Sequence, residues 1–229
     1  ASNNTAVGYH SLGLNTTGTL NTAIGQNAGA SITTGVRNTT VGAASLDANT
    51  TASDNTAVGY ASLSANTTGA NNTAVGKSAG AAVTTGASNT FIGGLAGDAI
   101  TTGSENTAVG YRALSTEDGN GLNTAIGVDS LMTQNAGANA YNTAVGYHSG
   151  KLVTTGSQNT FIGGLAGDST TTADNITAVG YKALEANTTG TQNVAVGSLA
   201  LDANTTANNN TAVGHGSLGA NTTGASNTA

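Results

Sequence analysis

The sequence predicts an all-β protein, a parallel β-solenoid (β-roll or β-helix) of thirteen coils with 17 residues each. Three observations predict this fold. A Gly follows each Val- or Ile-containing pair, and eleven of the twelve intervals between these glycines are 17 residues long. Gly, Asn, Thr and Ala dominate, and there is no Pro. No apolar stripe with the 3.6-residue period of a helix runs through a coil. Such a strict period is typical of stacked repeats.

The repeat fills residues 1–229 as a single array, and only a two-residue insertion near 134–141 breaks its period. One coil reads N-T-A-V-G-Y-x-S/A-L/G-x-x-N-T-T-G-x-x, and we number its slots from the leading Asn. The glycines that mark the period occupy slot 5: Gly8, Gly25, Gly42, Gly59, Gly76, Gly93, Gly110, Gly127, Gly146, Gly163, Gly180, Gly197 and Gly214.

The segment T-A-V-G-Y is expected to form a short strand that the Gly ends or bends. Slot 4 is Val or Ile in every coil, and we expect it to supply the interior. Slot 8 is always Ser or Ala, which indicates a position without room for a larger side chain. The later N-T-T-G segment is expected to form a second extended piece and a turn, with its Gly at positive φ.

Slots 9 and 12 vary together. Where slot 9 is Leu, slot 12 is polar, as in Leu63 and Asn66; where slot 9 is Gly, slot 12 is Ile, Val or Thr, as in Gly80 and Val83. All thirteen coils follow this rule. Because close-packed interiors tolerate exchanges that conserve volume, we infer that the two slots share one core space. The leading Asn and the slot 2 Thr are each expected to form a ladder from coil to coil.

Such a coil buries little apolar area against the entropy of ordering 17 residues, about 1–2 kcal/mol of backbone each. Burial of a further face against sister chains would compensate for this. We therefore expect an oligomer, a side-by-side homotrimer, and the small Ala and Ser slots would permit close approach of the chains.

The recurring "NTAVG" and "NTAIG" with a Gly-rich return resemble the head repeats of trimeric autotransporter adhesins. "NTAVGYxAL" also looks like repeats of phage tail fibres and other surface fibres. The resemblance covers the whole chain, although its 17-residue period is longer than that usual in adhesin heads. It implies a β-roll, three chains side by side, and an extracellular location on a cell surface or virion appendage.

No catalytic, cofactor or metal site is expected. The glycines of "GGLAGD" lack the spacing and the following Lys of a phosphate-binding loop. Asp recurs at slot 10 in only four coils, whereas calcium-binding repeats carry it in nearly every coil, so a turn position is the simpler interpretation. The three histidines, His10, His148 and His215, lie in variable slots that we expect to be solvated.

Two groups of residues are candidates for a partner surface. The first is a row of tyrosines at slot 6, which could stack on sugars or line a subunit interface. The second belongs to "NTFIGGLAGD", which occurs at 89–98 and 159–168 and carries Leu at slot 7: its Phe is expected to cover the space that Tyr leaves, at a chain interface or as a small exposed patch. The candidates are Tyr9, Tyr60, Tyr111, Tyr147, Tyr181, Phe91, Leu95, Phe161 and Leu165.

We therefore expect a non-enzymatic extracellular fibre segment, a rigid multivalent rod from an adhesin or a tail fibre, whose partners are its own copies and a surface glycan or host receptor. The few charges, with a net charge of −6, argue against nucleic acid, and no apolar run predicts membrane insertion. One alternative is an ice-binding solenoid with Thr ladders. Another is a structural filament whose units stack end to end, because both ends fall within a repeat and the natural protein is otherwise expected to be longer.

Overall fold

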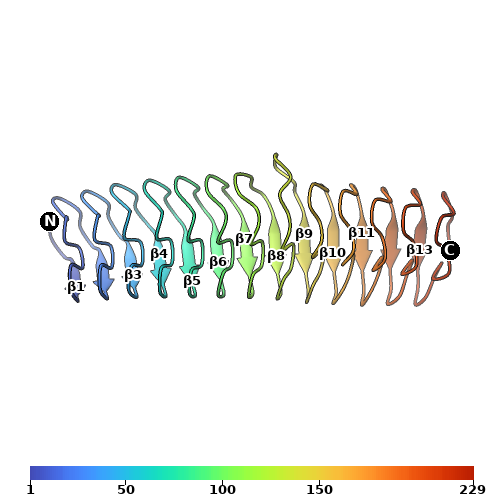
Figure 1. Cartoon of the computed structure of the whole chain (residues 1–229), viewed down its shortest axis with the longest axis horizontal. Coiled ribbons are helices and arrows are strands. Elements are labelled where there is room, and N and C mark those ends of the chain that lie inside the picture. Colours follow the sequence, from blue (N-terminus) through green and yellow to red (C-terminus); the bar gives the residue numbers. More distant parts are fainter. The chain divides into compact units, whose positions relative to one another are not determined.

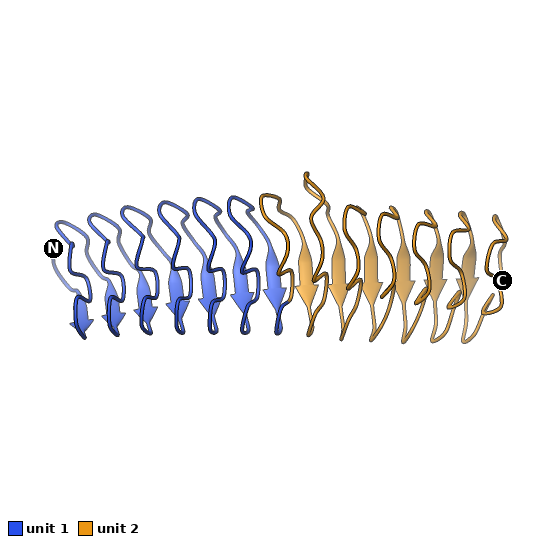
Figure 2. Ribbon diagram, viewed as in Figure 1, with its two compact units in different colours: residues 1–112 blue, residues 113–229 orange.

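The structure is a computed structural model that describes all residues from 1 to 229. Its regular elements are thirteen short strands, and it contains no helix. The chain divides into two compact units, residues 1–112 and residues 113–229, which Figure 2 distinguishes by colour. Within each unit the coils stack, and each complete coil contributes one strand to a parallel sheet. The predicted all-β parallel solenoid is therefore confirmed.

The strands follow one another along each unit (Figure 1). Unit 1 contains β1 (Thr5–Val7), β2 (Thr22–Ile24), β3 (Thr39–Val41), β4 (Thr56–Val58), β5 (Thr73–Val75), β6 (Thr90–Ile92) and β7 (Thr107–Val109). Unit 2 contains β8 (Thr124–Ile126), β9 (Thr143–Val145), β10 (Thr160–Ile162), β11 (Thr177–Val179), β12 (Val194–Val196) and β13 (Thr211–Val213).

Neighbouring strands within a unit pair in parallel and in register. Thr5 lies opposite Thr22 in unit 1, and Thr124 lies opposite Thr143 in unit 2. Equal slots of successive coils therefore stack on one another. The pairing of Thr124 with Thr143 skips the two inserted residues, which lie in the loop after β8. This loop projects beyond those of the neighbouring coils in unit 2 (Figure 1), so register is kept on both sides of the insertion.

Each strand is three residues long, and its middle residue points inward while the residues on either side point outward. Ala74 is fully buried, whereas Val75 is 37% exposed. The expectation that the slot 4 Val or Ile fills the interior is therefore wrong. The interior at slot 3 is narrow because side chains from slot 9 reach the same space, and in most coils only Ala fits there.

Slots 9 and 12 do share one core space, as their covariation predicts. Leu63 and Asn66 are both fully buried in one coil. In a coil with Gly at slot 9, Cδ1 of Ile32 lies 2.9 Å from the place that a Cβ on Gly29 would take. The β-branched side chain at slot 12 thus fills the volume that Leu fills elsewhere.

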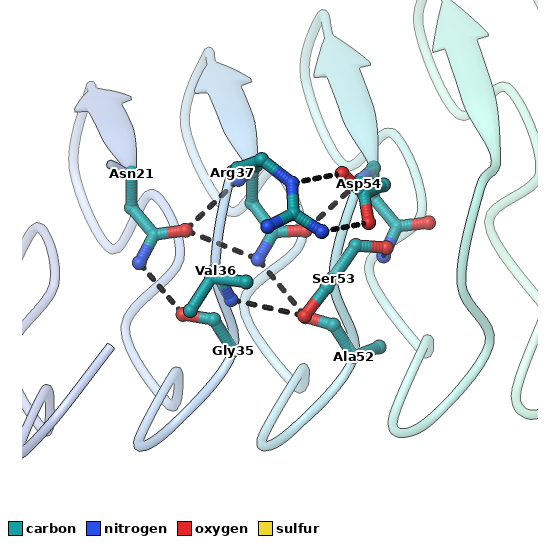
Figure 3. Close-up of polar contacts among 9 residues, drawn as sticks. Asn21, Gly35, Val36, Arg37, Ala52, Ser53 and Asp54 are labelled. Atoms are coloured by element: carbon teal, nitrogen blue, oxygen red, sulfur yellow. Dashed lines mark hydrogen bonds and ion pairs between the residues drawn. The ribbon is translucent and has the colours of Figure 1, made fainter. Parts of the chain in front are cut away.

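The predicted Asn ladder is present, and Figure 3 shows part of it in unit 1. Asn21 Oδ1 accepts a hydrogen bond from the backbone N–H of Asn38 at 2.9 Å, and Asn21 Nδ2 donates to Gly35 O at 2.8 Å. Asn21 thus satisfies a turn in its own coil and the first backbone N–H of the next, and Asn38 repeats both contacts one coil further on. In unit 2, Ile176 replaces one ladder residue, but its N–H still donates to Asn159 Oδ1.

The N-T-T-G segment differs from the expectation, because it forms bends and no second strand. Its Gly does not adopt positive φ. Gly is needed there because a Cβ on Gly35 would strike the carbonyl oxygen of Ala52 in the next coil. Positive φ occurs instead at slots 5, 7, 9 and 17. At slot 5, Gly76 has φ +142°, and a Cβ there would lie 2.5 Å from Gly93 O. Slot 5 therefore requires Gly on two counts.

Candidate functional site

The outer face of each sheet presents two parallel rows of side chains. Slot 2 contributes Thr in every strand except β12, which begins with Val194, and slot 4 contributes Val or Ile throughout. Ile92 in unit 1 is 41% exposed and Ile162 in unit 2 is 40% exposed, although both are flanked by paired strands. We call these two rows the sheet face. It carries no charged side chain in either unit, and its β-branched slot 4 side chain is exposed or half-buried in every coil.

The slot 6 tyrosines lie on the surface beyond the sheet face, one Gly after the slot 4 row. Their exposed fractions run from 50% for Tyr111 to 72% for Tyr9. In four of the five cases the ring contacts the side chain that follows it. The rings of Tyr147 and His148 stack at 3.8 Å, and the guanidinium of Arg112 lies 5.2 Å from the ring centroid of Tyr111. The other two pairs are Tyr9–His10 and Tyr181–Lys182.

Two of these rings lie over a glycine of the preceding coil. A Cβ on Gly94 would be 3.5 Å from Tyr111 Cδ2, and a Cβ on Gly164 would be 3.6 Å from Tyr181 Cδ2. Both glycines belong to "NTFIGGLAGD". The Tyr ring of the following coil therefore lies within ordinary van der Waals distance of a side chain at this slot.

Phe91 and Phe161 do not lie at the surface, where we expected them. Both are fully buried, so they form neither an exposed patch nor a surface for another chain. They point inward because slot 3 is the inward residue of the strand, whereas Tyr at slot 6 points to solvent. Leu95 and Leu165 are half-buried at slot 7 and adopt positive φ of 58° and 60°.

The space for each Phe comes from two glycines at slot 9. A Cβ on Gly80, in the preceding coil, would lie 2.7 Å from Phe91 Cδ2, and a Cβ on Gly97 in the same coil would strike the same ring. Gly150 and Gly167 flank Phe161 in the same way. A sequence signal existed for this packing. Two successive coils with Gly at slot 9 occur only at these two places, and in each the second coil carries Phe.

The two Thr residues of the N-T-T-G segment have different surroundings. The slot 13 hydroxyl donates to the slot 13 carbonyl of the next coil, as Thr33 Oγ1 does to Thr50 O at 3.0 Å. The slot 14 residue, for example Thr34 or Thr85, is exposed. As the alternation along the chain suggested, one Thr of each pair is available for an external array, and it forms an edge separate from the sheet face.

Charged side chains are few, and some of them form ion pairs. Arg37 binds Asp54 of the next coil through Nε–Oδ1 at 2.6 Å and Nη2–Oδ2 at 2.8 Å (Figure 3). This hydrogen bond lowers the pKa of Asp54 and raises the pKa of Arg37. His10 and His215 are exposed as expected, whereas His148 is largely covered: its Nε2 lies 3.4 Å from Asp129 Oδ2 and its Nδ1 lies 3.8 Å from Asp168 Oδ1.

Comparison with known proteins gives no further assignment: no protein-family model matches the chain, and no curated protein or solved structure is significantly similar to it. The structure has no helix that is both long and apolar enough to cross a membrane. The candidate functional surfaces are therefore defined by geometry alone, as the sheet face and the adjoining row of tyrosines.

Proposed function

We propose that the chain is a non-enzymatic segment of an extracellular fibre and that its copies associate side by side through the sheet face. The observation that carries this proposal is the row of Val and Ile at slot 4, which points to solvent in every coil. A fold with so few large apolar side chains places one of them outside in each repeat. Covering this row with a sister chain would give it a role in stability.

The energetic argument favours association over a solvated face. Fully burying a Val or Ile side chain contributes about 1.5–3 kcal/mol, so covering one that is about 40% exposed adds roughly 1 kcal/mol. The gain recurs from coil to coil, and it is smaller where the slot 4 side chain is half-buried, as at Val58. No charged side chain on the sheet face opposes the contact. We expect three copies, as in the adhesin heads that the repeats resemble.

The fibre would display binding groups on its remaining surface. Tyr rings at 50–72% exposure, steadied by the neighbouring side chain, present flat apolar faces with a polar tip. Such groups suit a surface glycan or a protein receptor. Repetition along the chain would make the binding multivalent, so that weak single contacts add up.

Analytical ultracentrifugation tests the association. Val58→Asp together with Val75→Asp places two charges on the sheet face of adjacent coils, and we expect this variant to dissociate to monomers while circular dichroism remains unchanged. The matched control is Thr68→Asp with Thr85→Asp, which adds the same charges to exposed slot 14 residues of the same coils. A wild-type chain that sediments as a monomer at high concentration would refute the proposal.

One observation favours ice binding as a second candidate. The outward residues of β5, Thr73 and Val75, repeat in register, which gives a lattice with spacings of about 4.8 Å between coils and about 6.6 Å along the strand. Regular, uncharged arrays of hydroxyl and methyl groups can order water. Thermal hysteresis by a monomeric chain, lost in the Val58→Asp, Val75→Asp variant, would establish this function in place of association.

A further inference from the structure

Two departures from the repeat occur in succession at the start of unit 2. In the first, the residues at slots 12–15 are Glu117, Asp118, Gly119 and Asn120 in place of N-T-T-G. In the second, the following coil contains the two-residue insertion. The two irregular loops touch, because the N–H of Gly121 donates to Asn139 Oδ1 at 3.1 Å.

Glu117 takes the place of an Asn that closes the turn in other coils. Asn66, for example, donates from Nδ2 to Gly69 O at 2.9 Å and accepts from Gly69 N at 2.8 Å. Glu117 accepts at Oε1 from Asn120 Nδ2 at 2.9 Å. Its other oxygen, Oε2, is enclosed without a hydrogen-bond partner, and the residue is fully buried. A buried carboxylate with an unpaired oxygen is costly unless a proton or a cation neutralises it.

The stretch of chain between Arg112 and His148 contains no positive side chain, since residues 113–147 include no Lys, Arg or His. Asp118, the next residue, adds a second carboxylate, whose negative charge acts on Glu117. Burial is the main cause that raises the pKa of Glu117, and the negative charge of Asp118 raises it further.

We propose that this loop, residues 116–121, binds a divalent cation of the calcium type through Glu117 Oε2 and the carboxylate of Asp118. Calcium accepts six to eight oxygen ligands in flexible geometry, including carbonyl, amide and water oxygens. The loop offers such oxygens on Asn120 and on its backbone, with two glycines that permit it to bend. It does not contain a group of three acidic or His ligands, so the affinity belongs to the weak extracellular class, with a Kd of about 10⁻⁴–10⁻³ M.

Mg²⁺ should bind more weakly at this site. It demands near-ideal octahedral geometry and gives up its water reluctantly, whereas a loop of uneven oxygens around one buried carboxylate cannot impose that geometry. The bound cation would order the irregular loop, which contacts the insertion of the next coil through Gly121 and Asn139. It does not depend on association of the chains.

Isothermal titration calorimetry of the full chain with CaCl2, after removal of metals with a chelator, tests the site. We expect about one Ca²⁺ per chain, weaker binding of MgCl2, and a rise in Tm with Ca²⁺. Glu117→Gln keeps the shape of the side chain and should weaken Ca²⁺ binding at least tenfold, and Asp118→Asn should also weaken it. Glu105→Gln, the same change at an exposed position in unit 1, should bind like the wild type.

Two results would overturn the proposal. One is a wild-type chain that gives neither binding heat nor a Tm shift at Ca²⁺ concentrations of about ten times the expected Kd. The other is Ca²⁺ binding by Glu117→Gln with unchanged affinity, which would place the cation elsewhere. Should Glu117→Gln fail to fold, Asp118→Asn decides the question, because this residue is exposed and unchanged affinity there would equally refute the site.

Discussion

The ring of Phe91 occupies space that two glycines leave open, Gly80 in the preceding coil and Gly97 in its own. The same arrangement recurs around Phe161 in unit 2. In other coils a small residue at slot 3 faces a larger side chain at slot 9 or slot 12. The volume of the core is thus conserved across coils, although the residues that supply it change.

Phe91→Ala should be strongly destabilising because the glycines on either side cannot fill the cavity. We expect a loss of about 3–5 kcal/mol, the usual range for removing a buried Phe. Guanidinium unfolding followed by circular dichroism measures it. Ile92→Ala, at the neighbouring exposed position, is the control and should cost about 1 kcal/mol or less in the isolated chain. Equal effects of the two changes would contradict the inward position of Phe91.

Gly76→Ala tests the close stacking of coils at slot 5. Its Cβ would lie 2.5 Å from Gly93 O at a φ of +142°, so the two coils would have to separate or the backbone to change. We expect a loss of at least about 1–3 kcal/mol, as for other strained backbone positions. Gly94→Ala is the matched control: its nearest neighbour would be the Tyr111 ring at 3.5 Å, an ordinary contact. Thermal unfolding should separate the two variants clearly.

The period and the covariation of slots 9 and 12 were sufficient to predict the solenoid, the Asn ladder and the shared core space. The orientation of the strand was not predicted correctly, because Val58 and Ala57 are both apolar and either could face inward. Only the width of the interior decides between them, and that width depends on how Leu63 and its counterparts fold back. The buried position of Phe91 follows from the same orientation. Assigning the wrong face of the strand to the interior therefore misplaced both the slot 4 Val and the slot 3 Phe.

The candidate surfaces were predictable to a smaller extent. The row of tyrosines was visible at one slot, and the structure places these side chains on the outside. The sheet face was missed because its Val and Ile residues were assigned to the core. The surroundings of Glu117 could not be predicted from the sequence, because slot 12 is polar in every coil with Leu at slot 9. Only the structure shows that its Oε2 is enclosed without a hydrogen-bond partner.

Asn72→Ala should show how much the ladder contributes. Asn72 Oδ1 accepts from Asn89 N at 3.0 Å, and Asn72 Nδ2 donates to Gly86 O at 2.8 Å, all in buried surroundings. The change leaves two backbone groups without partners, at a cost of about 1–3 kcal/mol each. Thr85→Ala, an exposed change in the same coil, should be nearly neutral. Hydrogen exchange should localise the weakening to the coils around Asn72, and protection there equal to the wild type would contradict a structural ladder.

Half-buried carboxylates should make the free energy of unfolding depend on pH. Asp98 has one enclosed oxygen without a partner, and burial raises its pKa above the ordinary value of 3.8. Between that value and the raised one, the folded chain holds more protons than the unfolded chain, so stability falls as pH rises through this window and stays lower above it. Asp54 acts in the opposite direction, because its pairing with Arg37 lowers its pKa, but it is exposed and its contribution is small.

Asp98→Asn should therefore stabilise the chain by about 1 kcal/mol at pH 7, where the wild-type carboxylate is ionised, and the gain should shrink as pH falls below that window. Unfolding midpoints measured from pH 3 to pH 7 would show the two curves converging at the acid end. Asp54→Asn supplies the opposite control: it should lose a little stability at pH 7 and none once the wild-type carboxyl is protonated. A benefit of Asp98→Asn that does not change with pH would mean that burial of the charge is not its cause.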